Sequence, residues 1–150
     1  MKTLLLLTIL FAFLQSAFLP VDFVLSLIIA RTLVVEDKSN LYLAFFAGLI
    51  LSFLMQVNLG YYPLLLILLV KLASLIRSLP VSFNLLMVIG AAATLVGIGE
   101  ILNMLITGQQ FSLQRIIIEI VAVIPFYYLI TFWEDRFVAS THTKLRLNKK

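Results

Sequence analysis

The sequence predicts an all-α integral membrane protein with six transmembrane helices. Of its 150 residues, 63% are apolar and only 12% are charged, so little of the chain has the polarity of a solvated surface. Continuous apolar runs recur at close to the ~20 residues that cross a bilayer core of about 30 Å. The cations gather in alternate connectors between these runs. Together these observations favour one polytopic membrane domain over residues 1–150.

Six apolar runs qualify as spans, and the second of them is short. They cover residues 3–19, 22–35, 41–57, 61–76, 81–106 and 113–133. The connectors carry breaker residues such as Pro20, Gly60, Pro80 and Gly108. We expect helices because the runs are continuously apolar, whereas barrel strands alternate in polarity with a period of two.

The distribution of cations predicts the orientation. With a cytoplasmic amino terminus, ten of the eleven cations lie inside and only Arg115 lies outside. The inner ten are Lys2, Arg31, Lys38, Lys71, Arg77, Arg136, Lys144, Arg146, Lys149 and Lys150. The bias favours an even number of spans, with both termini and the basic tail at 134–150 in the cytoplasm.

A second interpretation of the first run is a cleaved signal peptide. Lys2 precedes the run, and Gln15-Ser16-Ala17 supplies small residues. No A-x-A pattern is present, however, and the run is longer than a usual signal core. We therefore expect the segment to be retained as a span.

The inventory of reactive side chains argues against an enzyme. The chain has no cysteine, its one histidine is His142 in the tail, and no G-x-x-x-x-G-K motif is present. We therefore expect no catalytic residue, no metal site and no cofactor. The surplus of positive charge is explained by anionic lipid headgroups and does not imply nucleic acid.

Ionisable residues at membrane depth call for a reason, because each costs around 3 kcal/mol to insert. Glu100 is the deepest, Asn103 lies one turn away, and Arg115 and Glu119 form an i, i+4 pair on the last span. The Gly108 turn brings the two spans together, so we expect a Glu100–Arg115 contact. Two interpretations stay open: a structural ion pair, which we favour, and a polar pocket or partner seam opening outward.

Small residues form a second feature of the predicted helices. Ala44 and Gly48 are four residues apart in the third span, and Ala93 and Gly97 are four apart in the fifth. The fifth span contains two further small residues, Gly90 and Gly99. Such spacing lets helix backbones approach closely. We interpret it as packing within this bundle, with a face for another membrane protein as the alternative.

Three stretches of the sequence have an order of residues that points to a known family. The first contains Leu14-Gln15, Leu19-Pro20 and Asp22. The second is Ala47-Gly48-Leu49-Ile50-Leu51, leading to Asn58-Leu59-Gly60-Tyr61-Tyr62, and the third is Leu69-Val70-Lys71-Leu72-Ala73-Ser74-Leu75-Ile76-Arg77. These stretches resemble the rod-shape-determining inner-membrane protein family MreD. The likeness extends to chain length, six spans and a basic tail. Two positions depart from it: Ser52 stands where the family commonly has an acidic residue, and Gln56-Val57 replaces a small, flexible pair.

The resemblance implies a non-enzymatic scaffold of the bacterial cell-elongation machinery, in the inner membrane. Its implied partners are an MreC-like membrane protein, peptidoglycan synthases and the actin-like filament protein. The family-like positions, with implied roles in turn geometry and partner docking, are Gln15, Pro20, Asp22, Gly48 and Gly60.

The alternative function is the substrate-binding subunit of a small-solute, vitamin-like transporter. MreD-like proteins resemble the six-helix fold of the substrate-binding components of energy-coupling-factor transporters, so fold alone does not separate the two. A transport subunit would direct Glu100, Asn103, Arg115 and Glu119 into an outward cavity. A scaffold would show these groups paired with each other.

Overall fold

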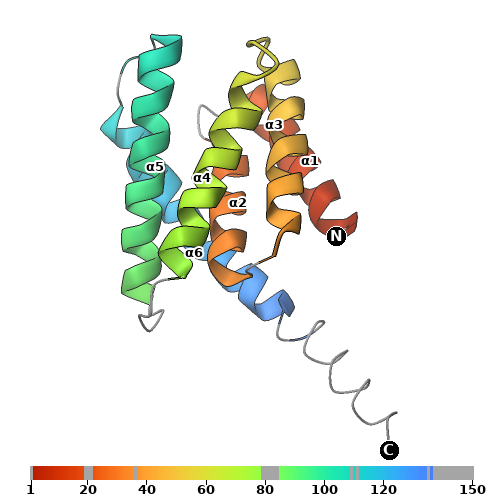
Figure 1. Cartoon of the computed structure of the whole chain (residues 1–150), viewed down its shortest axis with the longest axis vertical. Helices are drawn as coiled ribbons and strands as arrows, with labels where there is room; N and C mark the ends of the chain where they lie inside the picture. The colour runs from red at the N-terminus through yellow and green to blue at the C-terminus, as the bar shows by residue number, and fades with distance from the viewer. Residues whose placement is uncertain are drawn as a thin grey trace, which may run out of the picture.

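Six helices run alternately in opposite directions (Figure 1). The computed structural model describes residues 2–18, 22–35, 37–78, 85–108, 110, 112–134 and 136. Across these residues the chain is all-helical and contains no strand, which confirms the all-α prediction. The helices are α1 (Lys2–Phe18), α2 (Phe23–Val34), α3 (Ser39–Leu54), α4 (Tyr61–Arg77), α5 (Leu85–Thr107) and α6 (Leu113–Trp133).

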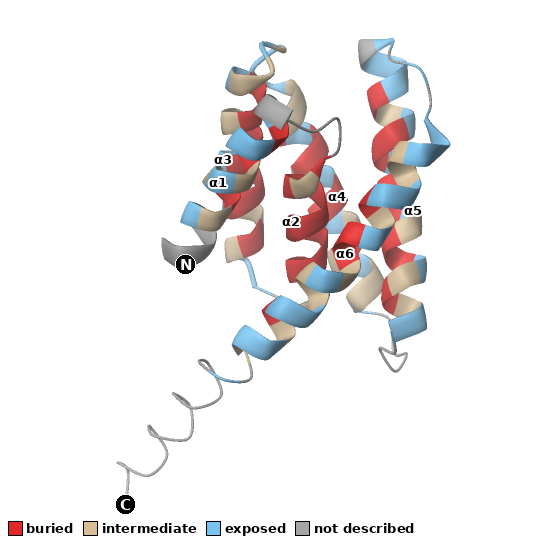
Figure 2. Cartoon of the chain, turned by 180° about the vertical axis from the view of Figure 1, so that it is seen from behind, coloured by how far each residue is buried: buried red, intermediate tan, exposed pale blue. Residues whose placement is uncertain are grey.

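The shortest helix, α2, lies at the centre of the bundle and packs against each of the other five. Ten of its 12 residues are buried, and Figure 2 shows it buried along nearly its whole length. At a rise of about 1.5 Å per residue, α2 is roughly 18 Å long. Because its neighbours cover it on all sides, a helix this short needs no contact with the surroundings of the bundle.

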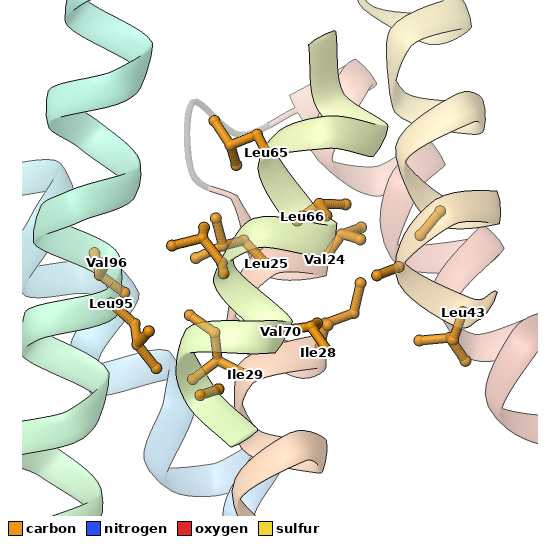
Figure 3. Packing of buried hydrophobic residues seen from close by; sticks show 14 of the residues in the cluster. Val24, Leu25, Ile28, Ile29, Leu43, Leu65, Leu66, Val70, Leu95 and Val96 are labelled. Atoms are coloured by element: carbon orange, nitrogen blue, oxygen red, sulfur yellow. The ribbon is translucent and has the colours of Figure 1, made fainter. Parts of the chain in front are cut away.

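The core forms where the apolar side chains of α2 meet those of α4, α5 and α3. Ile28 and Ile29 of α2 pack with Val70 of α4 and Leu95 of α5, all of them almost completely buried (Figure 3). Each buried side chain of this kind gains dispersion energy from its many close contacts. A smaller cluster around Leu27 and Val123 joins α2 to α6. The core therefore fixes the helices relative to one another.

The helix bounds agree closely with the predicted runs. The prediction is exact at both ends of α6 and within one residue for α4. We expected the third run to reach residue 57, but α3 ends at Leu54, where Gln56 turns the chain with a φ of 54°. Gly108 follows α5 with a φ of 69°, a conformation that favours glycine, and its N–H donates to the Met104 carbonyl.

Some sequence predictions lie outside the described residues. These are the Pro20 turn, the start of the fifth run at 81–84, and the tail beyond residue 136, which includes His142.

The alternating directions place the cations of the described chain at two ends of the bundle. Arg31, Lys38, Lys71 and Arg77 lie near the connectors α2–α3 and α4–α5, at the same end as the carboxyl end of α6 (Figure 1). We call this the basic end. Arg115 lies at the opposite end, in the first turn of α6.

Two of the described helices, α5 and α6, are long and apolar enough to cross a membrane. The apolar helices α2 and α3 and the apolar stretch of α1 are shorter.

Candidate functional site

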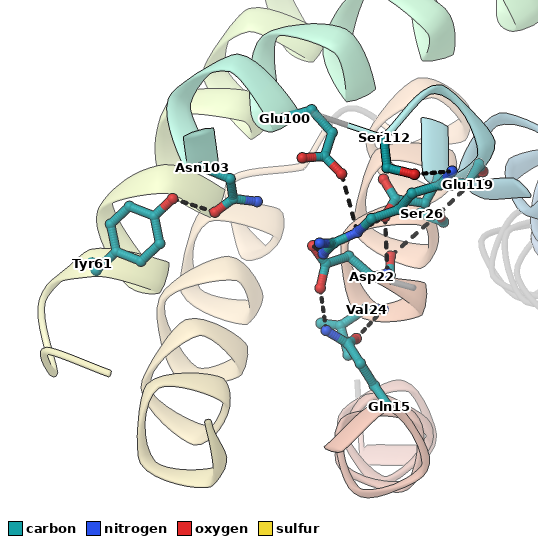
Figure 4. Close-up of polar contacts among 10 residues, drawn as sticks. Gln15, Asp22, Val24, Ser26, Tyr61, Glu100, Asn103, Ser112 and Glu119 are labelled. Carbon is teal, nitrogen blue, oxygen red and sulfur yellow. Dashed lines mark hydrogen bonds and ion pairs between the residues drawn. The ribbon is translucent and has the colours of Figure 1, made fainter. Parts of the chain in front are cut away.

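Four charged side chains from three parts of the chain meet at the end of the bundle opposite the basic end (Figure 4). They are Asp22, which precedes α2, Glu100 on α5, and Arg115 and Glu119 on α6. The three carboxylates are almost completely buried, whereas the Arg115 side chain is 21% exposed. We call these four residues, together with Gln15, the Arg115 network.

Arg115 is the hub of the network. Its Nη2 donates to Oδ2 of Asp22 at 2.7 Å, and its Nε lies 3.1 Å from one oxygen each of Glu100 and Glu119. Because Nε carries a single hydrogen, it donates to Glu119, and the Oε1 atom of Glu100 is held by charge without a hydrogen bond. The Glu100–Arg115 contact that the sequence predicts is therefore present, within a larger set of charges.

Asp22 connects the network to α1 and α2. Its carboxylate accepts a hydrogen bond from Nε2 of Gln15, and Oε1 of Gln15 accepts the backbone N–H of Val24 at 3.3 Å. That N–H belongs to the first turn of α2, which has no intrahelical partner to offer it. Gln15 therefore satisfies the start of α2 and positions Asp22 for Arg115 at the same time.

Glu119 joins α6 to the start of α2. Its Oε1 accepts the backbone N–H of Asp22 at 3.1 Å, and its carbonyl oxygen accepts from the Ser26 hydroxyl at 3.2 Å. Ser112 caps α6 by accepting the N–H of Arg115 at 3.5 Å, which orients the first turn of the helix. The network therefore ties together α1, α2, α5 and α6.

Asn103 joins α5 to α4. Its Oδ1 accepts a hydrogen bond from the Tyr61 hydroxyl, a contact between α5 and the first residue of α4 (Figure 4). The sequence analysis did not predict this bond to Tyr61. The spacing from Glu100 to Asn103 was the available signal, but it does not reveal which helix lies opposite.

The family-like positions lie in different parts of the bundle. Gln15 and Asp22 lie inside the Arg115 network, and Pro20 is outside the described residues. Gly48 packs against the backbone of α4: an added Cβ would lie 2.4 Å from Cα of Pro63. Gly60 is exposed, with nothing within 4 Å of such an atom. The role of these positions in partner docking stays a prediction.

The prediction that small residues pack within the bundle holds for α3 and fails for part of α5. Ala44 is fully buried, and Gly48 allows α3 and α4 to approach closely. At Gly90 and Gly97, by contrast, an added Cβ would meet nothing within 4 Å, so that interpretation is wrong for them. The physical reason is that α5 lies at the edge of the bundle (Figure 1), where no described neighbour packs against these two positions.

Ser52, one of the departures from the family pattern, is completely buried on α3. Its hydroxyl has no hydrogen-bond partner among the described residues. An unpaired buried hydroxyl costs about 1–3 kcal/mol. The Ser52 side chain therefore contributes no hydrogen bond to the described part of the bundle.

A second polar group at the basic end went unnoticed in the sequence. Nε of the buried Arg31 donates to Oδ1 of Asn40 at 2.7 Å, and Nδ2 of Asn40 donates to the Val35 carbonyl at 2.7 Å. The Nη1 atom of Arg31 is buried without a hydrogen-bond partner in the described chain. The short connector between α2 and α3 was the signal, since it brings residues nine positions apart together.

Three cavities with described linings lie away from the Arg115 network. They have volumes of about 560 Å³ between α3 and α4, about 610 Å³ between the ends of α2, α4 and α6, and about 340 Å³ beside the α2–α3 connector. Residues of the network line none of the three. In the described chain, no group of three or more acidic or histidine side chains is arranged to hold a metal ion.

No protein-family model, curated protein or solved structure matches this chain significantly.

Proposed function

We propose that the bundle spans a membrane six times. The inverted distribution of polarity carries this proposal: charged groups are buried, while large apolar side chains such as Phe53, Leu86 and Leu105 are more than 70% exposed. Only 39% of the apolar stretch of α5 and 28% of that of α6 are buried (Figure 2). A water-soluble protein rarely exposes apolar surface on this scale, whereas lipid accommodates it.

The proposed orientation follows the positive-inside rule. The basic end faces the cytoplasm, and the Arg115 network faces the outer side of the inner membrane. The short helix α2 fits such a bundle because protein, rather than lipid, surrounds it.

Within that membrane frame, the function we propose is a non-enzymatic scaffold of the cell-elongation machinery, like the MreD family that the sequence resembles. Its partners would be an MreC-like membrane protein, with peptidoglycan synthases and the actin-like filament protein in the same assembly. The closed Arg115 network supports a scaffold over a solute-binding subunit, because its polar groups bind one another. A solute site would need some of these groups free to bind the ligand.

The outward face of α5 is the place where a partner helix would fit this proposal. Gly90 and Gly97 leave the backbone uncovered, and small residues let a second helix approach within van der Waals contact. A leucine at residue 97 would hold such a helix away without disturbing contacts inside the bundle.

The test is a crosslinked pull-down of the tagged full chain from its native membrane, with the partners identified by mass spectrometry. We expect recovery of an MreC-like protein, and a loss of at least about tenfold for Gly97→Leu, equivalent to 1.4 kcal/mol. Val121→Leu, a bulk-adding change on the exposed face of α6, is the matched control and should leave recovery unchanged.

The opposite result would be a transporter coupling subunit recovered with its ATPases. That outcome would replace the scaffold with the solute-binding function. If the Gly97→Leu variant recovers as much MreC-like protein as the parent chain, the partner does not bind at this face of α5.

A further inference from the structure

An exposed apolar groove runs along the surface between α3 and α4. It has a volume of about 560 Å³ and is lined on the α3 side by Phe45 and Leu49 and on the α4 side by Leu64, Ile67 and Leu68. Lys71 stands at its end nearest the basic end. In the proposed membrane-spanning orientation, which we call the membrane frame, the groove faces the acyl chains of lipid.

A second, partly polar cavity begins at the same lysine. It has a volume of about 340 Å³, and its lining includes Lys38, Asn40, Lys71 and Ser74. The two cavities therefore share Lys71, one on its apolar side and the other on its polar side.

Helix periodicity shows that the two cavities follow one face of each helix. On α3, Leu41 lines the polar cavity, and Phe45 and Leu49 line the groove, at steps of four residues. On α4, Ile67, Lys71 and Ser74 follow one another at steps of four and three. Residues at these spacings lie above one another on a helix. We call the continuous surface the α3–α4 trough.

The trough combines an apolar wall with positive charge at one end. Neither Lys38 nor Lys71 forms an ion pair within the described residues. Arg31 lies behind the polar cavity, bound to the lining residue Asn40, and its buried Nη1 has no hydrogen-bond partner among the residues that the structure describes.

One carboxylate, that of Asp37, also lines the polar cavity. The Ser39 hydroxyl and backbone N–H both donate to it, and these hydrogen bonds hold the pKa of Asp37 below its usual value. Asp37 therefore stays charged at neutral pH. Lys38 and Lys71 stand against it in the lining, and Arg31 lies behind them near a second carboxylate, that of Glu134, so three cations and two anions leave a net charge of about +1 at this end.

We propose that the α3–α4 trough binds one anionic phospholipid, with its headgroup phosphate at Lys38 and Lys71 and an acyl chain along Phe45, Ile67 and Leu68. The net positive charge complements a phosphate, and the lysines lie at the depth of the inner headgroups in the membrane frame. From Gly60 to Lys71 the groove follows eleven residues of helix rise, roughly 16 Å, which suits an extended acyl chain. The proposal rests on membrane insertion and is independent of the scaffold function.

Native mass spectrometry of the delipidated full chain, with added phosphatidylglycerol or phosphatidylcholine, tests the headgroup end. We expect one molecule of phosphatidylglycerol to bind tightly and phosphatidylcholine to bind with clearly lower affinity. Lys71→Gln should weaken phosphatidylglycerol binding about fivefold, and the double change with Lys38→Gln about 25-fold, because each basic residue contributes about 1 kcal/mol near an anionic headgroup. Arg136→Gln removes an exposed cation elsewhere and should change nothing.

The apolar end is tested by Leu68→Trp, which fills the groove, with Leu86→Trp on the exposed face of α5 as the matched control. Leu68→Trp should weaken the binding of both lipids. Free inorganic phosphate should fail to displace phosphatidylglycerol from the parent chain. Displacement by phosphate would overturn the lipid assignment, because it would show that the groove adds nothing to recognition.

Three further results would overturn the proposal. Equal affinity for the two lipids would show that Lys38 and Lys71 do not recognise an anionic headgroup. A photocrosslinker at residue 68 that captures a polypeptide in cells, in place of lipid, would assign the trough to a partner helix. If the chain fails to insert into lipid nanodiscs, the proposal that it spans a membrane is wrong. If it inserts but binds both lipids equally, only the phospholipid proposal is wrong.

Discussion

The Nη2 atom of Arg115 lies 2.7 Å from Oδ2 of Asp22, although 93 residues separate the two in the sequence. This contact joins the first turn of α6 to the start of α2, the central helix. Since Glu100 and Glu119 contact the same guanidinium, one cation faces three buried carboxylates. The network is therefore more sensitive to loss of its arginine than to loss of any one acid.

Arg115→Gln should destabilise the protein by about 3–5 kcal/mol, because it leaves three buried carboxylates without a countercharge. Glu100→Gln should be mild, since Asp22 and Glu119 still pair with the arginine. Arg115→Lys should fall between them, because an ammonium cannot reproduce the fork of the guanidinium. Thermal unfolding of the purified variants in detergent measures the order. Equal tolerance of Arg115→Gln and Glu100→Gln would contradict the hub role of Arg115.

Gln15→Leu should cost about 1–3 kcal/mol, because it leaves the Val24 N–H without its acceptor and removes the Gln15 hydrogen bond to Asp22, which keeps its bond from Arg115. The neighbouring Ser16→Ala is the control, since Ser16 is exposed and binds only within α1. The same unfolding assay compares the two. A stability loss that is equal in both variants would show that the effect arises from α1 itself.

Gly48→Ala should destabilise the contact between α3 and α4. The added methyl would lie 2.4 Å from Cα and N of Pro63, which is backbone and cannot move aside as a side chain can. Overpacking of this kind costs about 1–3 kcal/mol. Gly60→Ala is the matched control, with open space and a φ of −93° that alanine adopts freely, so its melting temperature should not fall. A Gly48→Ala protein as stable as the parent would mean that α3 and α4 lie further apart.

Gln56→Gly should stabilise the protein. Gln56 has a φ of 54°, which costs a residue with a side chain about 1–2 kcal/mol and glycine almost nothing. The greater freedom of glycine in the unfolded chain offsets about 0.5–1 kcal/mol of this relief, so we expect a net gain of up to about 1.5 kcal/mol. Gln56→Ala keeps the strain and serves as the control. A loss of stability on Gln56→Gly would show that the glutamine side chain itself supports the turn.

Much of the fold follows from local patterns in the sequence. Hydropathy and breaker residues located α4 and α6 within a residue, and the short Gly108 turn was enough to predict that Glu100 meets Arg115. Each of these inferences uses residues close together in the chain. The early end of α3 depended on the positive φ of Gln56, which no hydropathy pattern reveals.

The rest of the network depends on which helices are neighbours. Asp22 and Gln15 reach Arg115 only because α2 packs against α6 at the centre of the bundle. Apolar runs of similar composition do not encode such an order in a single sequence. For the same reason, the outward direction of Gly90 and Gly97 could not be told from the inward direction of Gly48.

Labelling of single cysteines in sealed, right-side-out membrane vesicles tests the proposed six-span arrangement most directly, because the native chain has no cysteine. An impermeant maleimide should label Asn58→Cys and Gln110→Cys from outside, since both residues are exposed at the end that holds the Arg115 network. Lys38→Cys and Ser78→Cys, exposed at the basic end, should be labelled only after the vesicles are opened. Labelling of Lys38→Cys or Ser78→Cys in sealed vesicles would contradict the account.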